Sequence, residues 1–367
     1  MSNKRPFDFG IFITVLILLA MGVIMVFSAS SHYALTKMGN SYHFLIRQLL
    51  WAGVGLAAML FMASFNYKQL KKISFLVFIL GLALLVIVFI PGIGDTRNNA
   101  TRWIDLRFTT VQPSEIMKLG IILFFAASLA KRGDRIKKFW AGLCPYLIII
   151  GVIDVLLLLE PHMSAAAVIT AIGVILLFAA GAKVWHFVLL AAPALAGAAA
   201  LIVTSEYRLR RITAFLDPWQ DKMGDGWQII QSLYAIGSGG LFGLGLGKSR
   251  QKFLYIPEPH NDFIFSILAE ELGFVGVVAV LALFLIFIWR GLRVAMSAPD
   301  LFGGFVALGI TMMVAIQVVI NIAVVTSSMP VTGMSLPFFS YGGTALSILM
   351  AAVGILLNIS RHADINK

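Results

Sequence analysis

The sequence predicts an all-α, polytopic membrane protein with about ten transmembrane helices. Hydrophobic residues make up 60% of the 367 residues and charged residues 12%, about half the charged share of a soluble domain. The apolar residues come in runs of roughly 18 to 25, the length that an α-helix needs to cross a bilayer. The runs do not alternate in polarity as the strands of a transmembrane barrel do, and this excludes a barrel.

Ten apolar runs define the expected spans, and a long polar stretch separates the seventh from the eighth. The spans are 9–28, 45–63, 73–90, 113–130, 141–159, 164–181, 184–204, 263–290, 301–325 and 341–359. We find no internal repeat and no soluble domain, so residues 1–367 are expected to form one integral-membrane domain. The first run is too long for the core of a signal peptide and lacks a clean cleavage site, so we interpret it as the first span.

Cations in the short loops predict the orientation. All of them fall on one side when ten spans alternate, and the positive-inside rule makes that side cytoplasmic. These cations are Lys4, Arg5, Lys68, Lys71, Lys72, Lys131, Arg132, Arg135, Lys137, Lys138, Arg290, Arg293, Arg361 and Lys367. Both termini are then cytoplasmic, whereas residues 91–112, 160–162 and 326–340 lie outside, together with the long extracytoplasmic loop 205–262.

Six cations of the loop 205–262 break this rule. They are Arg208, Arg210, Arg211, Lys248, Arg250 and Lys252. A long translocated loop tolerates cations, so solvated side chains are one interpretation. Six cations close to an outer surface nevertheless favour an anionic ligand there. In the same loop, residues 227–236 are amphipathic enough to form a helix that lies in the membrane interface.

Three titratable side chains, Glu258, His260 and Asp262, end this loop within five residues. Asp is a good helix N-cap, and the eighth span is expected to begin at Phe263, so capping is one interpretation of Asp262. The other is catalytic, because a partly desolvated carboxylate at the edge of a membrane has a pKa raised towards that of a useful base. The residues alone leave both interpretations open.

Ionisable residues also occur within the spans. Glu115 and Lys118 have the i, i+3 spacing of an ion pair on one helix face. Ionisable residues in a span are costly and suggest function, with a structural ion pair as the alternative. The adjacent Glu270 and Glu271 face different sides of the eighth span, so at least one of them requires a polar partner.

Three further patterns carry weaker predictions. Gln317 and Asn321, spaced i, i+4, are expected to join neighbouring helices. The prolines and glycines of residues 330–343 predict a tightly folded or re-entrant outer loop that is buried in protein or lines a cavity. The glycines of residues 237–247 lack the dinucleotide-binding spacing, so we expect them to let the backbone turn tightly and approach a ligand or a helix.

Taken in order along the chain, these motifs resemble the SEDS family of peptidoglycan polymerases, which includes RodA, FtsW and SpoVE. The resemblance is carried by Arg47-Gln48-Leu49, Arg102-Trp103-Ile104, Tyr207-Arg208, Arg211-Ile212 and residues 112–118, 228–232, 257–265, 270–273 and 330–343. Each motif alone is modest, but their order over ten spans is highly specific. The short loops and the run Arg250-Gln251-Lys252-Phe253 favour the FtsW/SpoVE branch.

The resemblance implies a peptidoglycan glycosyltransferase that polymerises lipid II, the undecaprenyl-pyrophosphate-linked disaccharide-pentapeptide. It implies action at the outer face of the bacterial cytoplasmic membrane, in division, elongation or sporulation. A class B penicillin-binding protein is the implied partner, with other cell-wall or divisome proteins and without nucleic acid. The family's essential acid matches Asp262, and the residues that match Glu115 and Lys118 border the same cavity.

Asp262 is therefore the expected catalytic residue, a general base for the attacking sugar hydroxyl, while cations stabilise the charge on the leaving pyrophosphate. The expected substrate-binding or cavity residues are Arg47, Arg102, Glu115, Lys118, Arg208, Arg211, Gln231, Ser232, Lys248, Arg250, Lys252, Glu258, His260, Thr332 and Ser340. We assign no metal site. A divalent cation, Mg or Mn, could assist, although the sequence does not show one.

The chain departs from the family pattern at two places. Glu160-Pro161-His162 stands where the family usually has Gln-Pro-Asp, so a structural role of that aspartate passes to Glu160 or is absent. Ser335 stands where the family usually has proline.

Two other classes of function fit part of the sequence. A lipid II flippase would need a hydrophilic path that reaches the cytoplasmic half. A non-catalytic scaffold for a transpeptidase would not need a carboxylate inside a cationic cavity. The expected polar cluster lies mostly outside, and this favours the enzyme.

Overall fold

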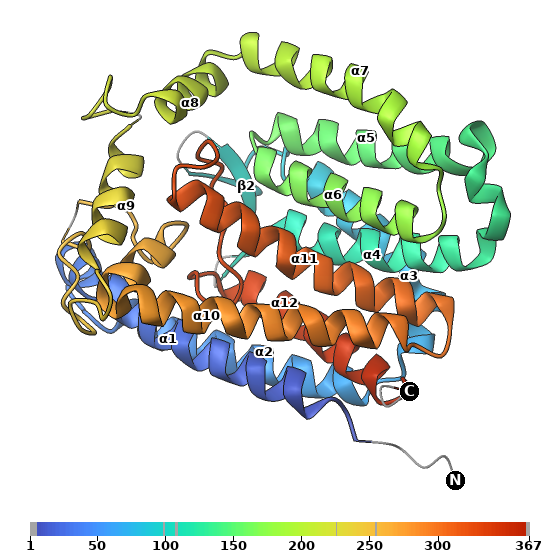
Figure 1. Ribbon diagram of the computed structural model, residues 1–367, viewed down its shortest axis with the longest axis horizontal. Coiled ribbons are helices and arrows are strands. Elements are labelled where there is room, and N and C mark those ends of the chain that lie inside the picture. The colour runs from blue at the N-terminus through green and yellow to red at the C-terminus, as the bar shows by residue number, and fades with distance from the viewer. Residues whose placement is uncertain (1–5, 98–99, 107–108, 225, 254, 365–367) are drawn as a thin grey trace.

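The computed structural model describes residues 6–97, 100–106, 109–224, 226–253 and 255–364, and helices dominate it (Figure 1). Lys4, Arg5 and Lys367, which helped to predict the orientation, lie outside the described residues, as does the side chain of Tyr207.

Each of the ten expected spans corresponds to one helix. The helices are α1 (Phe9–Met38), α2 (His43–Ser64), α3 (Tyr67–Ile87), α4 (Pro113–Arg132), α5 (Cys144–Leu159), α6 (Met163–Ala179), α7 (Val184–Val203), α10 (Ile264–Met296), α11 (Leu301–Val325) and α12 (Gly343–Ser360). Within the described chain, eight are long and apolar enough to cross a membrane, α4 and α5 with their adjoining 3-10 and π turns. The shorter apolar helices are α6 and the first half of α7. The chain is a multi-pass membrane protein.

Several helices extend beyond their apolar runs. The expected first span ends at Ser28, but α1 continues to Met38 and ends where Gly39 adopts a φ of +70°, donating its N–H to the Leu35 carbonyl. Glycine tolerates this left-handed conformation and so stops the helix. The last ten residues of α1 are more polar, and hydropathy alone therefore placed the helix end too early.

Small residues let the central helices approach closely. α12 packs along α2, and α3 packs along α4. A Cβ atom at Gly354 of α12 would lie 2.3 Å from the Met59 carbonyl oxygen of α2, and one at Gly55 would lie 3.0 Å from the Met350 side chain. The contact at Gly354 leaves no room for a side chain, and the one at Gly55 is tight. Such close approach increases van der Waals packing between helices in a membrane.

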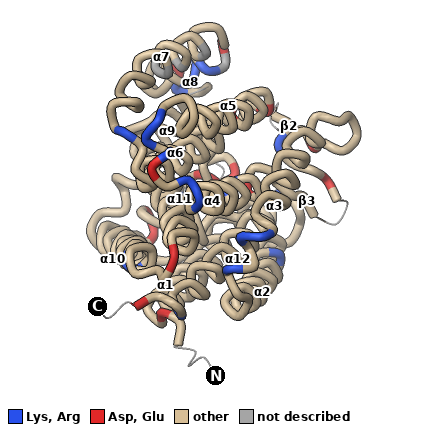
Figure 2. The backbone as a smooth tube through the Cα atoms, turned by 90° about the vertical axis from the view of Figure 1, so that its right-hand side faces the viewer, with Lys and Arg blue, Asp and Glu red and all other residues tan. Residues whose placement is uncertain are grey.

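The two ends of the bundle differ. The α2–α3, α4–α5 and α10–α11 turns meet with both ends of the described chain at one end, here called the terminal end (Figures 1 and 2). Lysines and arginines lie at the helix ends there (Figure 2). The opposite end, here called the loop end, carries the long loops.

The loop end contains structure that the sequence did not reveal. The segment 91–112, which was expected only to lie outside, contains an antiparallel sheet of β1 (Gly94–Arg97), β2 (Ala100–Asp105) and β3 (Thr110–Val111). In this sheet Gly94 pairs with Ile104 and Ile104 with Val111. The loop 205–262 contains α8 (Glu206–Leu216) and α9 (Trp227–Ser238). The second of these confirms the helix expected from amphipathicity, and its buried face includes Ile229, Ile230 and Ala235.

The glycine-rich stretch 237–247 packs against α10 where the helix is interrupted, and forms main-chain hydrogen bonds with it. Gly273 has a φ of +66° inside the helix. Main-chain bonds replace the helical ones there: Phe274 and Val275 donate to the carbonyls of Gly240 and Leu241, at 2.9 and 3.1 Å. A Cβ atom at Gly243 would lie 2.1 Å from the Glu271 carbonyl oxygen. The expectation that these glycines let the backbone approach a helix is confirmed.

Candidate active site

Asp262 lies two residues before α10, and its carboxyl faces the loop between α11 and α12. A Cβ atom at Gly333 would lie 3.4 Å from Asp262 Oδ2 and 4.0 Å from Arg102 Nη1. Three segments far apart in the sequence therefore converge on one point: the end of loop 205–262, strand β2 and the loop 330–342. The N-cap position of α10 is Phe263, and no side chain caps this helix. The capping interpretation of Asp262 is thus wrong.

Asn321 of α11 fixes the main chain at Asp262. Its Nδ2 donates to the Asp262 carbonyl oxygen at 2.8 Å and to the Met334 carbonyl oxygen at 2.6 Å. We expected Asn321 to join helices, but it joins two loops instead. An asparagine in an otherwise apolar span was the signal for a special role, although its partners are tertiary and could not be read from the sequence.

The loop 330–342 also holds the residues just before Asp262. Ser340 Oγ donates to the Asn261 carbonyl oxygen at 2.9 Å and accepts from the Leu336 N–H at 2.8 Å. The Tyr341 N–H donates to the His260 carbonyl oxygen at 2.9 Å. Ser340, expected as a cavity residue, therefore acts on the backbone that carries the carboxyl.

The carboxyl of Asp262 is tuned by its surroundings. Burial raises its pKa to about 6, and the negative charge of Glu258 adds to this effect. The positive charges of Arg102 and Arg211 act in the opposite direction on the same pKa. At neutral pH the group is thus ionised and more basic than an ordinary aspartate, which suits a general base.

Two guanidinium groups stand beside this carboxyl and are anchored on backbone carbonyls. Arg102 of β2 donates through Nη2 to the Pro161 carbonyl oxygen and through Nε to that of Glu160, at 3.3 Å. Arg211 of α8 donates through Nη1 to the Val331 carbonyl oxygen at 2.6 Å. These carbonyl oxygens hold the two guanidinium groups in place beside the carboxyl.

The departure from the family pattern at residues 160–162 places the side chains of Glu160 and His162 near Arg102. Burial raises the pKa of Glu160 to about 8, which outweighs the opposing charge of Arg102. His162 is buried, and burial together with the charges of Arg102 and Lys118 holds its pKa well below the usual value. Burial therefore favours the neutral forms of Glu160 and His162.

The pair Glu115 and Lys118 has the geometry expected from its spacing. Lys118 Nζ lies 2.7 Å from Glu115 Oε1, and the exposed fractions of the two side chains are 3% and 14%. The charge of Lys118 also reaches His162, whose Nε2 lies 3.4 Å from Gln112 Nε2. The pair therefore borders the polar region that contains Arg102.

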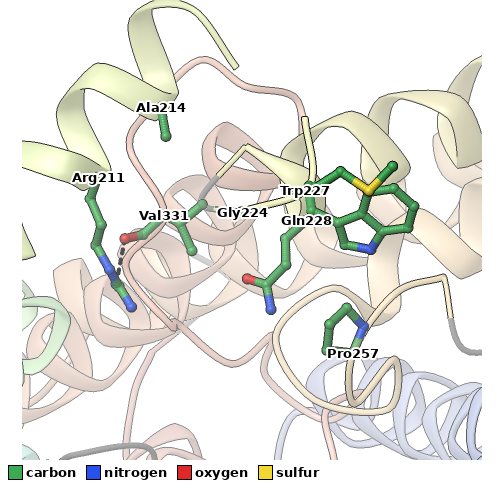
Figure 3. A pocket seen from close by; sticks show the side chains of 8 residues that line it. Arg211, Ala214, Gly224, Trp227, Gln228, Pro257 and Val331 are labelled. Carbon is green, nitrogen blue, oxygen red and sulfur yellow. Dashed lines mark hydrogen bonds between the residues drawn. The ribbon is translucent and has the colours of Figure 1, made fainter. Parts of the chain in front are cut away.

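A pocket of about 360 Å³ opens beside this region. Its lining residues are Arg211, Ala214, Met223, Gly224, Trp227, Gln228, Pro257 and Val331. The bond from Arg211 to Val331 lies on one side of the pocket, and Trp227, Gln228 and Pro257 lie on the other (Figure 3). The lining combines a cation and an amide with apolar and aromatic surface.

Comparisons with known proteins assign the family. A family model described as a cell cycle protein of the FtsW/RodA/SpoVE type matches residues 9–365. The chain belongs to the FtsW/RodA/SpoVE family. It is 48% identical over 362 residues to stage V sporulation protein E of Bacillus subtilis (strain 168), covering 99% of both chains. It is 45% identical over 360 residues to a probable peptidoglycan glycosyltransferase FtsW of Geobacter sp. (strain M18), covering 98% of both.

Solved structures of the family share the fold. A chain from a peptidoglycan synthase complex that coordinates polymerization and crosslinking superposes with a TM-score of 0.80 at 31% identity. The crystal structure of the Thermus thermophilus rod shape determining protein RodA superposes with a TM-score of 0.72 at 29% identity. Each comparison covers 98% of both chains. The resemblance that the sequence motifs predicted is confirmed.

Several residues that were expected to bind substrate or line the cavity have other partners. Lys252 is buried, and its Nζ lies 3.0 Å from Glu271 Oε1, so its charge is already paired. Ser232 Oγ lies 2.6 Å from Ser266 Oγ and donates to the Val325 carbonyl oxygen at 2.6 Å, which joins α9, α10 and α11. Gln231 is buried on the same helix.

The other cations that were expected to bind the substrate are more exposed to solvent than Lys252. Arg47, Lys248 and Arg250 have exposed side chains, whereas Arg208 lies one turn before Arg211 on α8 and is half-buried. Exposed cations attract an anion over a distance but do not hold it in one orientation.

His260 and Glu258, the two other titratable residues at the end of the loop, lie near Asp262 without contacting its carboxyl through a hydrogen bond that the structure shows. His260 is buried against the rings of Phe44 and Tyr33, with centroids 4.2 and 5.3 Å away, and burial lowers its pKa to about 4. Glu258 is exposed and accepts from Asn261 Nδ2 at 2.7 Å. Thr332 precedes Gly333, and its Oγ1 is buried with no hydrogen-bond partner among the described residues.

The sequence reasoning missed two features of this site. Gly333 has a φ of +72° and lies against Asp262, and the Val331 carbonyl oxygen orients Arg211. The glycines of residues 330–343 were a signal for an unusual backbone, but neither their φ angles nor their neighbours follow from the sequence.

Proposed function

We propose that this FtsW/RodA/SpoVE-family protein polymerises lipid II into glycan strands, with Asp262 as the general base. The observation that carries the proposal is a carboxyl of raised pKa between the anchored cations Arg102 and Arg211. Relatives that align with nearly the whole chain are named probable peptidoglycan glycosyltransferases, and this chain is an enzyme of that class.

The chemistry follows from the two kinds of group. Asp262 takes the proton from a sugar hydroxyl while the hydroxyl oxygen forms a bond to the anomeric carbon of the other sugar. The bond from that carbon to the pyrophosphate oxygen breaks, and the pyrophosphate leaves with the electron pair. A carboxyl with a pKa of about 6 accepts the proton and releases it to water before the next cycle.

Cations near the carboxyl stabilise the leaving group. Arg211 faces the pocket of about 360 Å³, which is large enough for a phosphate and part of a sugar ring. Fixed donors aimed at developing charge lower a barrier because they need no reorganisation during the reaction. Lys248 and Arg250 are exposed and would guide the anionic substrate from a distance.

The family's location and partner complete the proposal. The terminal end would face the cytoplasm, so that the active site at the loop end faces outward across the bacterial cytoplasmic membrane. A class B penicillin-binding protein would cross-link the strands, in line with a relative from a peptidoglycan synthase complex. Among the described residues no group of three or more His, Cys, Asp or Glu side chains could hold a metal ion. Assistance by a divalent cation, Mg or Mn, remains part of the proposal.

The interior of α4 favours the enzyme over a flippase. After Lys118 the buried face of α4 continues with Ile121, Ile122 and Phe125 towards the terminal end. A flippase needs a hydrophilic path past this level, and an apolar helix face does not line one. A scaffold, in turn, has no need for a carboxyl between two anchored cations.

Substitution of Asp262 tests the proposal directly. Asp262→Asn keeps the shape and removes the base, so lipid II polymerisation by the purified protein with its partner should fall about 10²–10⁴-fold. Asp262→Ala should fall equally, and both variants should melt near the parent temperature because the side chain does not cap α10. Glycan strands separated on a gel give the rate.

The matched control is Glu258→Gln, which removes a neighbouring carboxylate that is exposed. It should retain most of the activity. If Asp262→Asn polymerises at the parent rate while Glu258→Gln is inactive, Glu258 is the base and the assignment of Asp262 is wrong.

A further inference from the structure

A buried ion pair lies away from the proposed base, in a region that the mechanism does not use. Lys252 Nζ lies 3.0 Å from Glu271 Oε1 and 3.3 Å from Ser28 Oγ. Ser28 Oγ donates to the same carboxylate at 2.6 to 2.7 Å. Since the exposed fractions of the Lys252 and Glu271 side chains are 4% and 0%, no ligand reaches them. The cluster joins α1, α10 and the loop 205–262.

Glu270 binds the same piece of loop from its other side. It accepts hydrogen bonds from Ser249 Oγ at 2.5 Å and from the Arg250 N–H at 2.9 Å. The Gln251 N–H lies 3.4 Å from its Oε2. Ser249 also donates its N–H to Glu271 Oε1 at 3.2 Å. Two adjacent carboxylates thus hold four consecutive loop residues, 249–252, and we call this set of contacts the latch.

The burial of the Lys252 and Glu271 charges suggests a role for the latch other than stabilising the fold. Each buried charge carries a desolvation penalty, and a well-packed apolar contact between α1 and α10 would often be at least as stable. A charged network with many directional bonds instead accepts only one placement of its partners. Because the latch also lies next to the break of α10 at Gly273, it fixes the loop at the point where the helix backbone is least regular.

The loop continues from the latch to the base along α1. Phe253 packs edge-on against His32 with ring centroids 4.7 Å apart, and His260 packs against Tyr33 at 5.3 Å. Ser28, His32 and Tyr33 lie at i, i+4 and i+5 on α1, so one helix end supports the loop at Lys252, Phe253 and His260 in turn. Asn321 then holds the chain at Asp262 itself.

We propose that the latch is a positioning device: it holds residues 249–253 and 255–262 in one placement against α1 and α10, and so sets the carboxyl of Asp262 relative to Arg102 and Arg211. Lys252 and Glu271 are its positioning residues, and neither touches substrate. This inference rests on the proposed function of Asp262 as base. A shift of about 1 Å in a reacting group costs about 10²-fold in rate, so a loosened loop should lower turnover more than substrate binding.

Glu271→Gln and Lys252→Met test the latch. Glutamine keeps the size of the side chain and an oxygen for the Ser249 N–H, so the fold should survive in that variant. We expect kcat for lipid II to fall at least about tenfold, with KM changed less than about threefold. Hydrogen–deuterium exchange should become faster in peptides that cover residues 249–262 and stay at the parent rate in α2 and α12.

The chain offers a control in another ion pair, which joins α10 to the N-cap residue of α1. Arg290 Nη1 of α10 lies 2.7 Å from Asp8 Oδ1 at the start of α1. It stands roughly 30 Å from the latch along α1. Arg290→Met breaks this pair and should leave both kcat and the exchange of residues 249–262 near the parent values. Lys252→Arg, which keeps the charge, should recover part of the kcat lost in Lys252→Met.

The possible results separate the inference from the proposed function. Faster exchange confined to residues 249–262 together with reduced kcat supports the latch. Parent-like exchange in this segment, or faster exchange throughout the protein with a lowered melting temperature, overturns it. An equal loss of kcat in Arg290→Met also overturns it. Failure of the proposed function shows separately, as an absence of glycan strands from the parent protein, and the exchange data then still test whether the latch fixes the segment.

Discussion

Asp262 and Glu258 carry two carboxyl groups with different surroundings, and the pH dependence of the reaction should report the difference. The pKa of Asp262 is raised to about 6, by burial first and by the charge of Glu258 second. A base works only when ionised, so kcat/KM should rise with pH through about pH 6 and level off above it.

Glu258→Gln removes one cause of the raised pKa and should move the midpoint of this profile to lower pH. The measurement is the initial rate of lipid II polymerisation in a series of buffers of equal ionic strength. A midpoint that stays in place or moves upward in Glu258→Gln would show that Glu258 does not act on the base.

Arg211 and Arg210 are adjacent on α8 but differ in their contacts. Arg211 reaches Val331 beside the pocket, whereas Arg210 pairs with Glu206 on the exposed side at 2.5 Å. Arg211→Glu should weaken lipid II binding, and more at low salt than at high salt, because ions screen exposed charges. Arg210→Glu is the control and should have a smaller effect. Equal binding by the parent and Arg211→Glu at low salt would contradict a role in holding pyrophosphate.

The role of a single residue could be predicted from the sequence only where it did not depend on partners far away in the chain. Asp262 stood out as an acid at the start of a span, and the family resemblance selected it, but the choice between a cap and a base needed the geometry of α10. Lys252 was grouped with the anion-binding cations by its sign alone. Its partner Glu271 comes 19 residues later, and the two meet only because the loop 205–262 folds back against α10.

The ion pair of α4 is a property of the helix, since Glu115 and Lys118 meet through the i, i+3 spacing. Single substitutions should each impair polymerisation, because a buried charge is then left without its partner. The exchange Glu115→Lys with Lys118→Glu restores the pair in reversed order and should recover part of the activity if pairing is its main role. Complete inactivity of a stably folded double variant would instead indicate that one of the two groups contacts the substrate.

Long helices were predictable as elements, and amphipathicity predicted the short helix α9 but not α8. Runs of apolar residues located α1 to α7 and α10 to α12 because a bilayer demands length and hydrophobicity of each span. The strands β1 to β3 and the helix α8 have neither property. Their segments are short and rich in polar and charged residues, and their structure depends on contacts such as that of Arg102 with the α5–α6 turn.

The orientation of the whole molecule can be tested with cysteine labelling. The chain has one cysteine, Cys144, which Cys144→Ser removes. Lys248→Cys at the exposed loop end should then react with a membrane-impermeant maleimide added to intact cells. Lys137→Cys, whose side chain is also exposed, should react only after the membrane is opened. The reverse pattern would place the proposed active site in the cytoplasm and exclude polymerisation at the outer face.

The bond from Asn321 to the main chain of Asp262 has a practical consequence. The position of residue 262 is set by its carbonyl oxygen rather than by its side chain. A variant such as Asp262→Asn should therefore keep the arginines, the pocket and the loop 330–342 in place while turnover stops. Such a protein would hold an intact substrate, and it is the natural starting material for capturing the complex by cryo-electron microscopy.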